Sequence, residues 1–134
     1  MFEIRKLIDY DYLIEWAIED GANREDAENA RDSILFGYEA WEDGKILGTA
    51  YATYRDGLYT LDGHNKTNKF FGACILGKAV INDLFRDYTD TIFTYHDTER
   101  RSVTALAKRL GFKEVVRDKE KDMILLMLGV NDGS

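Results

Sequence analysis

The sequence lacks proline, and it contains one cysteine (Cys74) and two histidines (His64 and His96). A single cysteine cannot form a disulfide within the chain, so we expect a fold that does not depend on an oxidising compartment. Two histidines and one cysteine match no zinc-site spacing, and we expect no metal. Gly-x-Ser-x-Gly and Walker-type sequences are missing too, which argues against the hydrolases and nucleotide-binding proteins that carry them.

Long apolar runs and an excess of basic residues are also absent. No stretch approaches the roughly 18 residues of a membrane span, and no basic-then-apolar leader opens the chain. The 18 Lys and Arg residues are outnumbered by 25 Asp and Glu residues, for a formal net charge of −7. This balance argues against nucleic-acid binding, which needs a basic surface. We expect a cytoplasmic protein without nucleic-acid or membrane partners, although a phage-encoded protein of the host cytoplasm or the virion would have the same composition.

What the sequence does contain is typical of a globular protein. Hydrophobic residues make up 45% of the chain and charged residues 32%, a balance that disordered proteins do not have. The eight tyrosines and seven phenylalanines suggest a core rich in β-sheet. Residues 1–134 are enough for a single domain with a buried core.

Two Asp-Gly pairs organise the first half of the chain. Asp43-Gly44 and Asp56-Gly57 predict tight hairpin turns, because both central positions of such a turn adopt positive φ. They connect three apolar segments into an antiparallel meander. An alternating segment before the meander predicts a further strand, and two short helices lie between them. The predicted strands are 2–7, 34–42, 45–54 and 58–62, and the predicted helices fall within 9–21 and 23–33.

The second half alternates strands with helices. A polar turn at 63–68 leads into a long helix at about 69–88, followed by a strand at 91–96, a short helix and a last hairpin of 112–117 and 122–128. The order is therefore β-α-α-β-β-β-α-β-α-β-β. A strand–helix–strand unit after an antiparallel meander requires a mixed sheet with a right-handed crossover. We predict an α+β fold, with a mostly antiparallel sheet of about seven strands flanked by about four helices.

The polar turn before the long helix is a candidate binding site. A strand, a polar loop and a helix N-terminus in succession direct backbone N–H groups and the positive end of the helix dipole at one spot. An anionic group such as a phosphate would be stabilised there.

The segment Arg100-Arg-Ser-Val-Thr-Ala-Leu-Ala-Lys-Arg-Leu-Gly-Phe112 is similar to the last helix of the GNAT fold, which ends in Leu-Gly-Phe. The order of elements resembles the same family, the acyl-CoA-dependent N-acyltransferases, over nearly the whole chain. An ordinary helix C-cap would have the same ending whatever the function. The resemblance implies an N-acyltransferase that takes acetyl-CoA as cosubstrate and an amine as acceptor.

Members of this family hold the pyrophosphate of acetyl-CoA in a Gln/Arg-x-x-Gly-x-Gly/Ala loop before the third helix. The nearest match here is Lys69-Phe-Phe-Gly72-Ala73-Cys74, in which cysteine stands where a second small residue is usual. The resemblance implies that the pantetheine arm follows the fourth strand and that the phosphates meet this loop. The cofactor-binding residues so implied are Leu61, Asn65, Lys66, Asn68, Lys69, Gly72 and Ala73.

The family's usual general acid is missing. Many members carry an Asn early in the last helix and, near its middle, a Tyr that protonates the departing thiolate. By position these residues are Arg100 and Ala107 in this chain, and alanine cannot donate a proton.

Replacements must come from the ends of the fourth and fifth strands, which carry Asp62 and His64, and Tyr95 and His96. Asp62 or His96 would deprotonate the amine, directly or through water. A backbone N–H near Leu61 would polarise the thioester carbonyl. The predicted catalytic residues are thus Asp62, His96 and Tyr95. Asp62 and His96 also have a plain structural interpretation, as a turn residue and a residue of a helix-capping loop.

A second, narrower resemblance leaves an alternative open. Residues 61–66 and 90–95 look like parts of small virion-associated proteins of short-tailed phages, which have a GNAT-like layout and no established acetyl transfer. The alternative function is a non-catalytic GNAT-like binding or virion protein. For the enzyme, the partner would be a small-molecule or peptide amine, and the acidic surface suits a basic one. The chain is also a candidate homodimer.

Overall fold

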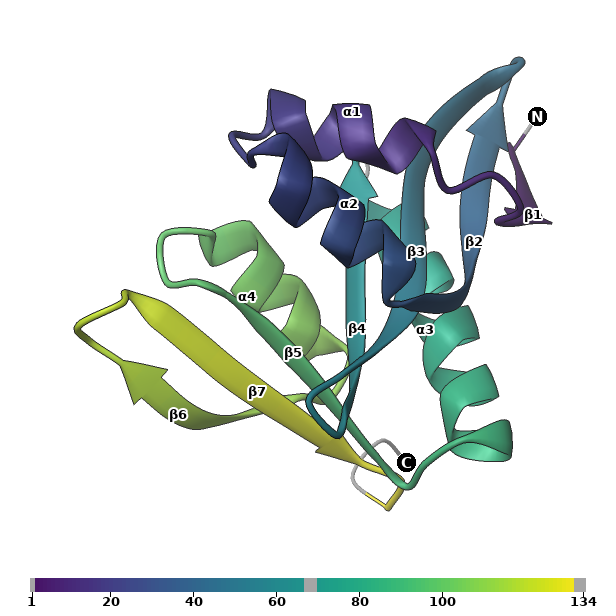
Figure 1. The fold of residues 1–134 in the computed structure, drawn as a ribbon. Coiled ribbons are helices and arrows are strands. Elements are labelled where there is room, and N and C mark those ends of the chain that lie inside the picture. Colours follow the sequence, from purple (N-terminus) through teal and green to yellow (C-terminus); the bar gives the residue numbers. More distant parts are fainter. Residues whose placement is uncertain (1, 67–69, 132–134) are drawn as a thin grey trace.

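The computed structural model describes residues 2–66 and 70–131, and its elements follow the predicted order (Figure 1). The described strands form one mixed sheet in the order β1-β2-β3-β4-β5-β7-β6, which confirms the α+β architecture. The strands are β1 (Phe2–Lys6), β2 (Ile34–Glu42), β3 (Lys45–Arg55), β4 (Leu58–Asn65), β5 (Thr91–Asp97), β6 (Lys113–Asp118) and β7 (Met123–Gly129). The helices are α1 (Tyr12–Glu19), α2 (Arg24–Asp32), α3 (Phe70–Asp87) and α4 (Arg101–Arg109).

The two Asp-Gly turns form as predicted. Asp43 and Gly44 have φ values of 52° and 79°, and Asp56 and Gly57 have values of 52° and 82°. Positive φ at both positions gives the turn a twist that matches that of the flanking strands. The turns join β2 to β3 and β3 to β4 as antiparallel hairpins.

Helices cover the sheet on both sides. In Figure 1, α1 and α2 lie on one face of the sheet, over β2, β3 and β4, and α3 and α4 lie on its other face, with α4 beside β5. Side chains along β3 alternate between the two faces of the sheet, and each face therefore has its own set of packing residues. Ala50 and Ala52 face the main core under α3, whereas Tyr51 packs with Leu13 of α1. The small alanines let α3 approach the sheet closely. The largest side chains that are completely enclosed in the main core come from α3, β5 and β7: Val80, Leu84, Ile92, Ile124, Leu126 and Leu128.

The Leu110-Gly111-Phe112 segment ends α4 as the sequence predicts. Gly111 has a φ of 106°, its N–H donates to Lys108 O at 3.1 Å, and the N–H of Phe112 donates to Ala107 O at 3.0 Å. These two bonds satisfy carbonyl groups that the end of a helix leaves without partners. Phe112 is buried in the main core, so the cap also fixes the start of β6.

The contact between β4 and β5 is the parallel pairing in the sheet, and it is short. β3 pairs with β4 from Leu58 to Asn65, and β5 pairs with β7 along the whole of β5. Among the described residues, β4 and β5 share just the register pair Thr60–Phe93. Beyond this pair the two strands part, which opens the sheet at its centre.

One boundary differs from the prediction. The first three residues of the predicted polar turn, Gly63 to Asn65, continue β4, and Gly63 lies opposite Ala50 of β3. Close backbone contact explains the extension, because a Cβ atom on Gly63 would lie 2.3 Å from Thr49 O. The glycine therefore lets β3 and β4 stay paired beyond the place where β4 leaves β5.

Candidate functional site

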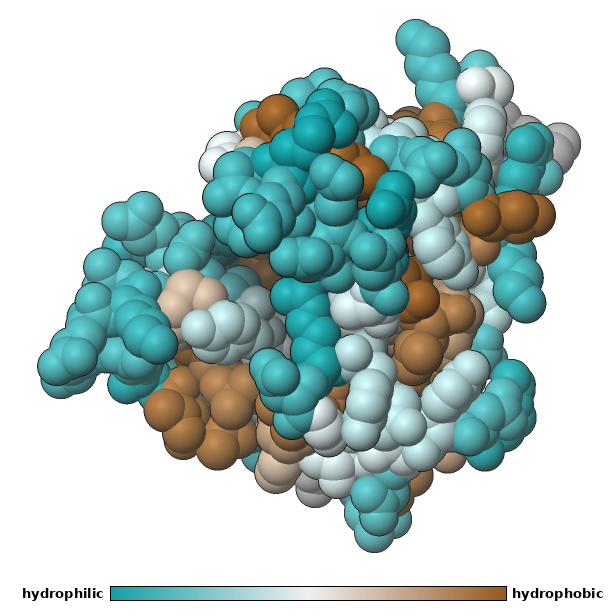
Figure 2. Space-filling view, in the orientation of Figure 1, coloured by the Kyte–Doolittle hydropathy of each residue, from teal (hydrophilic) through white to brown (hydrophobic). Residues whose placement is uncertain are grey.

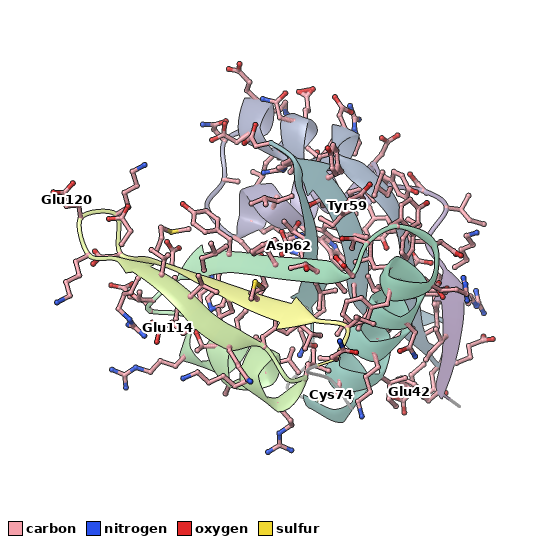
Figure 3. All side chains as sticks on the ribbon, turned by 90° about the horizontal axis from the view of Figure 1, so that it is seen from below. Glu42, Tyr59, Asp62, Cys74, Glu114 and Glu120 are labelled. Carbon is pink, nitrogen blue, oxygen red and sulfur yellow. The ribbon has the colours of Figure 1, made fainter. Side chains whose placement is uncertain are left out.

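A cavity of about 760 Å³ opens where β4 and β5 part. Its walls come from the ends of these two strands, from β3, from the first turns of α3 and from α4. Figure 3 shows Asp62 in the middle of the sheet layer, between the helices of the two faces. The predicted residues that line the cavity are Leu61, Asp62, Asn65, Gly72, Ala73, Tyr95 and His96.

Of the remaining predicted residues, Lys66 is described by the structure and is not part of the cavity lining. Asn68 and Lys69 lie outside the described residues. Lys66 turns toward α1, where its Nζ lies 2.8 Å from Glu19 Oε2 and 4.8 Å from the centre of the Trp16 ring. These contacts fasten the end of β4 to the C-terminal end of α1. A role for Lys66 in binding phosphate remains a prediction that would require the side chain to leave them.

His96 is a buried side chain at the cavity with one ring nitrogen engaged. Its Nε2 lies 2.7 Å from Thr104 Oγ1, and the Thr104 hydroxyl can donate to Arg100 O at 3.4 Å. This chain of donors favours the tautomer in which Nε2 carries the proton. The other nitrogen, Nδ1, is buried and has no hydrogen-bond partner in the described part of the chain. His96, a residue of the cavity lining, therefore holds a buried lone pair that lacks a donor.

Electrostatics keep this ring neutral. Burial lowers the pKa of His96 from its ordinary value of 6.5, and the positive charge of Arg100 lowers it further. The negative charges of Asp62 and Asp97 oppose these effects without outweighing them. At neutral pH, Nδ1 is thus available as a proton acceptor.

Asp62 and Tyr95 stand on the opposite face of the sheet from His96. Leu61 packs against the main core, so its neighbour Asp62 points to the side of α1 and α2. Asp62 Oδ1 accepts a hydrogen bond from the N–H of Gly63 at 2.8 Å. Tyr95 precedes the buried His96 and is 56% exposed. The cavity therefore has groups that can move protons on both of its faces.

Two further lining residues, Thr49 and Arg100, are not predicted as site residues from the sequence. Thr49 of β3 is 4% exposed, and its Oγ1 is buried without a hydrogen-bond partner among the described residues. Arg100 supplies the positive charge of the described lining, at the start of α4. Arg100 could have been found, because it stands where the GNAT family carries its Asn. Thr49 had no such signal, since one threonine in a strand of alternating residues looks structural.

His64 reaches the cavity from the side of α1. Its Nδ1 lies 3.4 Å from Asp20 Oδ2, and its Nε2 lies 3.3 Å from the hydroxyl of Tyr51. Burial raises the pKa of Tyr51, so this hydroxyl stays protonated and can donate to His64. The contacts hold the imidazole between α1 and the sheet.

The described part of the chain lacks two other kinds of site. No helix there is both long enough and apolar enough to cross a membrane. No cluster of three or more His, Cys, Asp or Glu side chains in the same residues could hold a metal ion.

Comparisons with known proteins identify the fold. No family model matches the sequence, and a search of curated proteins finds no match. Solved structures do match. The ribosomal-protein-S18-alanine N-acetyltransferase from Escherichia coli is 19% identical, with a TM-score of 0.72 over 97% of this chain and 94% of that one. An N-acetyltransferase from Staphylococcus aureus is 14% identical, with a TM-score of 0.73 over 98% and 99%.

An aminoglycoside acetyltransferase solved in complex with coenzyme A and kanamycin is 18% identical, with a TM-score of 0.70 over 98% of this chain and 96% of that one. At such identities the likeness shows the fold. The chain thus has the GNAT fold of N-acetyltransferases. These structures lend no support to the resemblance to virion proteins.

Proposed function

We propose that the protein is an N-acyltransferase that moves an acetyl group from acetyl-CoA to an amine. The observation that carries the proposal is the cavity at the parting of β4 and β5, because two residues of its lining, Thr49 and His96, each carry a buried polar atom, Oγ1 and Nδ1, without a partner among the described residues. Buried polar atoms without partners are unfavourable unless a ligand supplies them. The presence of coenzyme A and kanamycin in a structure of the same fold supports the choice of cosubstrate and acceptor class.

Different parts of the cavity lining suit different parts of acetyl-CoA. Leu61 and Asn65 offer the edge of β4 that β5 leaves uncovered, where the amides of a pantetheine arm can pair with backbone groups. Gly72 and Ala73 bring the first turn of α3 to the cavity, and the positive end of a helix favours phosphate. Arg100 adds a cation on the α4 side. We assign these residues to binding the cosubstrate.

The chain's own residues would manage the proton. In the transfer, the amine nitrogen forms a bond to the carbonyl carbon, the carbon–sulfur bond breaks, and the nitrogen loses a proton. His96 Nδ1 is suited to accept that proton, because its lone pair is free of hydrogen bonds in the described residues and the ring is neutral. His96 is also held against α4 by Thr104, one turn before Ala107. It can therefore pass the proton to the thiolate sulfur and replace the Tyr that the family usually carries at this helix.

Asp62 and Tyr95 serve the acceptor side in this proposal. Both face the side of α1 and α2, opposite the helices that flank the cosubstrate. The carboxylate of Asp62 would attract a cationic amine and is the alternative proton acceptor, while the Tyr95 hydroxyl is a hydrogen-bond donor. We propose a basic small molecule or peptide amine as the acceptor, in keeping with the net charge of −7.

Isothermal titration with CoA and acetyl-CoA tests the proposal. We expect micromolar dissociation constants, and at least about a tenfold loss of affinity in Arg100→Ala. Lys108→Ala is the matched control, because it removes a basic residue from the last turn of the same helix. Absence of binding at millimolar CoA would overturn the proposal. If CoA binds, a thiol-release assay with a panel of amines then identifies the acceptor.

A further inference from the structure

The sheet has an open apolar face away from the cosubstrate side. Along β5, β7 and β6, alternate residues point to the side of α1 and α2, but these helices lie over β2 to β4 (Figure 1). The register places Tyr95, Leu125 and Val116 side by side across the three strands. Met127 and Met123 flank Leu125 along β7. We call this surface the open face, and Figure 2 shows apolar side chains exposed over β6 and β7.

The open face is unusually exposed to solvent for a surface made largely of apolar side chains. Tyr95 is 56% exposed and Val116 is 53% exposed. The residues that alternate with them in β5 and β7, such as His96 and Ile124, are buried on the other side. A contiguous apolar patch on a folded domain commonly marks an interaction surface.

Charges at the two ends of the open face have opposite signs. Lys113 lies beside Met127 at one end, and Asp118 lies beside Met123 at the other. Asp97 of β5 adds a second carboxylate to the Asp118 end. A β-bulge between Glu114 and Val116 makes this arrangement possible, because it shifts the register so that Lys113, Val116 and Asp118 share one face.

We propose that the open face binds the open face of a second copy of this chain. When two such faces meet with their strands antiparallel, Lys113 of each copy lies opposite Asp118 of the other, and the apolar rows meet between the two charge pairs. The alternative orientation puts Asp118 opposite the second copy's Asp97, and like charges face each other. Charge complementarity therefore selects one two-fold arrangement.

The position of the open face links the dimer to the cavity. Tyr95, Asp97 and Met123 belong to the open face and also line the cavity. A second copy would wall the side from which we propose that the acceptor enters. The face spans three strands about 4.8 Å apart, and interfaces that bury less than ~1,200 Å² in total are generally weak. The dimer should therefore dissociate on dilution.

Sedimentation velocity over a wide range of protein concentration tests this proposal. For the natural sequence we expect the mass to rise from one chain toward two. Val116→Lys should stay at one chain at every concentration. Val130→Lys is the matched control, because Val130 is similarly exposed, at 46%, and lies outside the open face; it should behave as the natural sequence.

A charge-exchange experiment tests the orientation. Lys113→Glu and Asp118→Lys each place like charges opposite each other, so each alone should be monomeric. In an equimolar mixture both pairs become attractive, and dimers should reappear. Asp118 Oδ1 also accepts hydrogen bonds from backbone N–H groups of the hairpin turn. Circular dichroism must therefore confirm that Asp118→Lys is folded. If it is not folded, the masses of the Lys113→Glu and Val116→Lys variants decide.

Three results would overturn the proposal. The first is a natural sequence that remains one chain at all concentrations. The second is dimerisation that Val116→Lys and Lys113→Glu leave unchanged. The third is a Val116→Lys variant with altered use of amines and unaltered mass, since the open face would then hold the acceptor. The first two results do not depend on CoA binding, so failure of the dimer and failure of the proposed activity can be told apart.

Discussion

His96 Nε2 lies 2.7 Å from Thr104 Oγ1, and this contact joins the end of β5 to the middle of α4 across the edge of the cavity. It holds a buried imidazole whose second nitrogen has no partner in the described residues. The contact between His96 and Thr104 connects a strand and a helix of the fold, and it also lies at the proposed site. It therefore has consequences for stability that can be measured without any ligand.

Folding stability should fall as the pH drops below 6.5 in a way that depends on His96. The pKa of His96 is lowered in the folded state, chiefly by burial, from the ordinary value of 6.5. Below that pH the unfolded chain binds a proton that the folded chain resists, so stability is lost until the pH reaches the folded pKa. Urea unfolding at a series of pH values should show a shallower dependence in His96→Gln, which keeps a donor for Thr104. An identical dependence in both proteins would mean that the ring is not buried as described.

Gly63→Ala should destabilise the fold strongly. A Cβ atom there would lie 2.3 Å from Thr49 O, and backbone atoms of a paired strand cannot move aside. We expect a loss of about 2 kcal/mol or more in the free energy of unfolding, measured in urea. Gly77→Ala is the control, because its Cβ would meet the end of the Leu110 side chain at 2.9 Å, and alanine favours a helix by ~1 kcal/mol over glycine. It should be close to neutral.

Gly72→Leu should weaken CoA binding, whereas Gly72→Ala should not. A Cβ atom on Gly72 would lie 3.5 Å from the Phe2 ring, which is an ordinary contact. A larger side chain must crowd Phe2 or enter the cavity beside the first turn of α3. By titration calorimetry we expect at least about a tenfold loss of affinity for Gly72→Leu, or ~1.4 kcal/mol. Unchanged affinity in both variants would place the phosphates elsewhere.

Tyr12→Phe should lower stability through Glu39. The Tyr12 hydroxyl donates to Glu39 Oε2, and the carboxylate is buried on the sheet beneath α1. Without this donor, Glu39 keeps the indole N–H of Trp41 at 3.1 Å. The expected loss is ~1.5–3 kcal/mol, the usual worth of a hydrogen bond to a charged group. Tyr54→Phe, at a tyrosine 48% exposed, should change stability by no more than about 0.5 kcal/mol.

Local signals in the sequence were enough for most of the fold. The Asp-Gly turns and the Leu-Gly-Phe cap depend on φ angles and bonds within a few residues, so neighbours in sequence determine them. The continuation of β4 through Gly63 depends instead on a close approach to Thr49, which lies in another strand. Contacts of this kind leave no mark on the local pattern.

The candidate site was predictable to the same extent. Strand ends are visible in the sequence, and Asp62, Tyr95 and His96 do line the cavity. The partner of a long side chain is not visible, and Lys66 meets Glu19 of α1 instead of the cavity. The orphaned nitrogen of His96 likewise depends on Thr104, which reaches it from α4.

The short pairing of Thr60 with Phe93 has a mechanical consequence. It divides the sheet into two half-sheets that meet along a narrow seam, with α3 as the covalent bridge between them. The opening at the centre of the sheet comes from missing strand pairing between β4 and β5, so the hydrophobic core under α3 stays intact. A molecule bound in the seam would act as the missing strand, and amide hydrogen exchange along the facing edges of β4 and β5 would slow as the two halves stiffen into one.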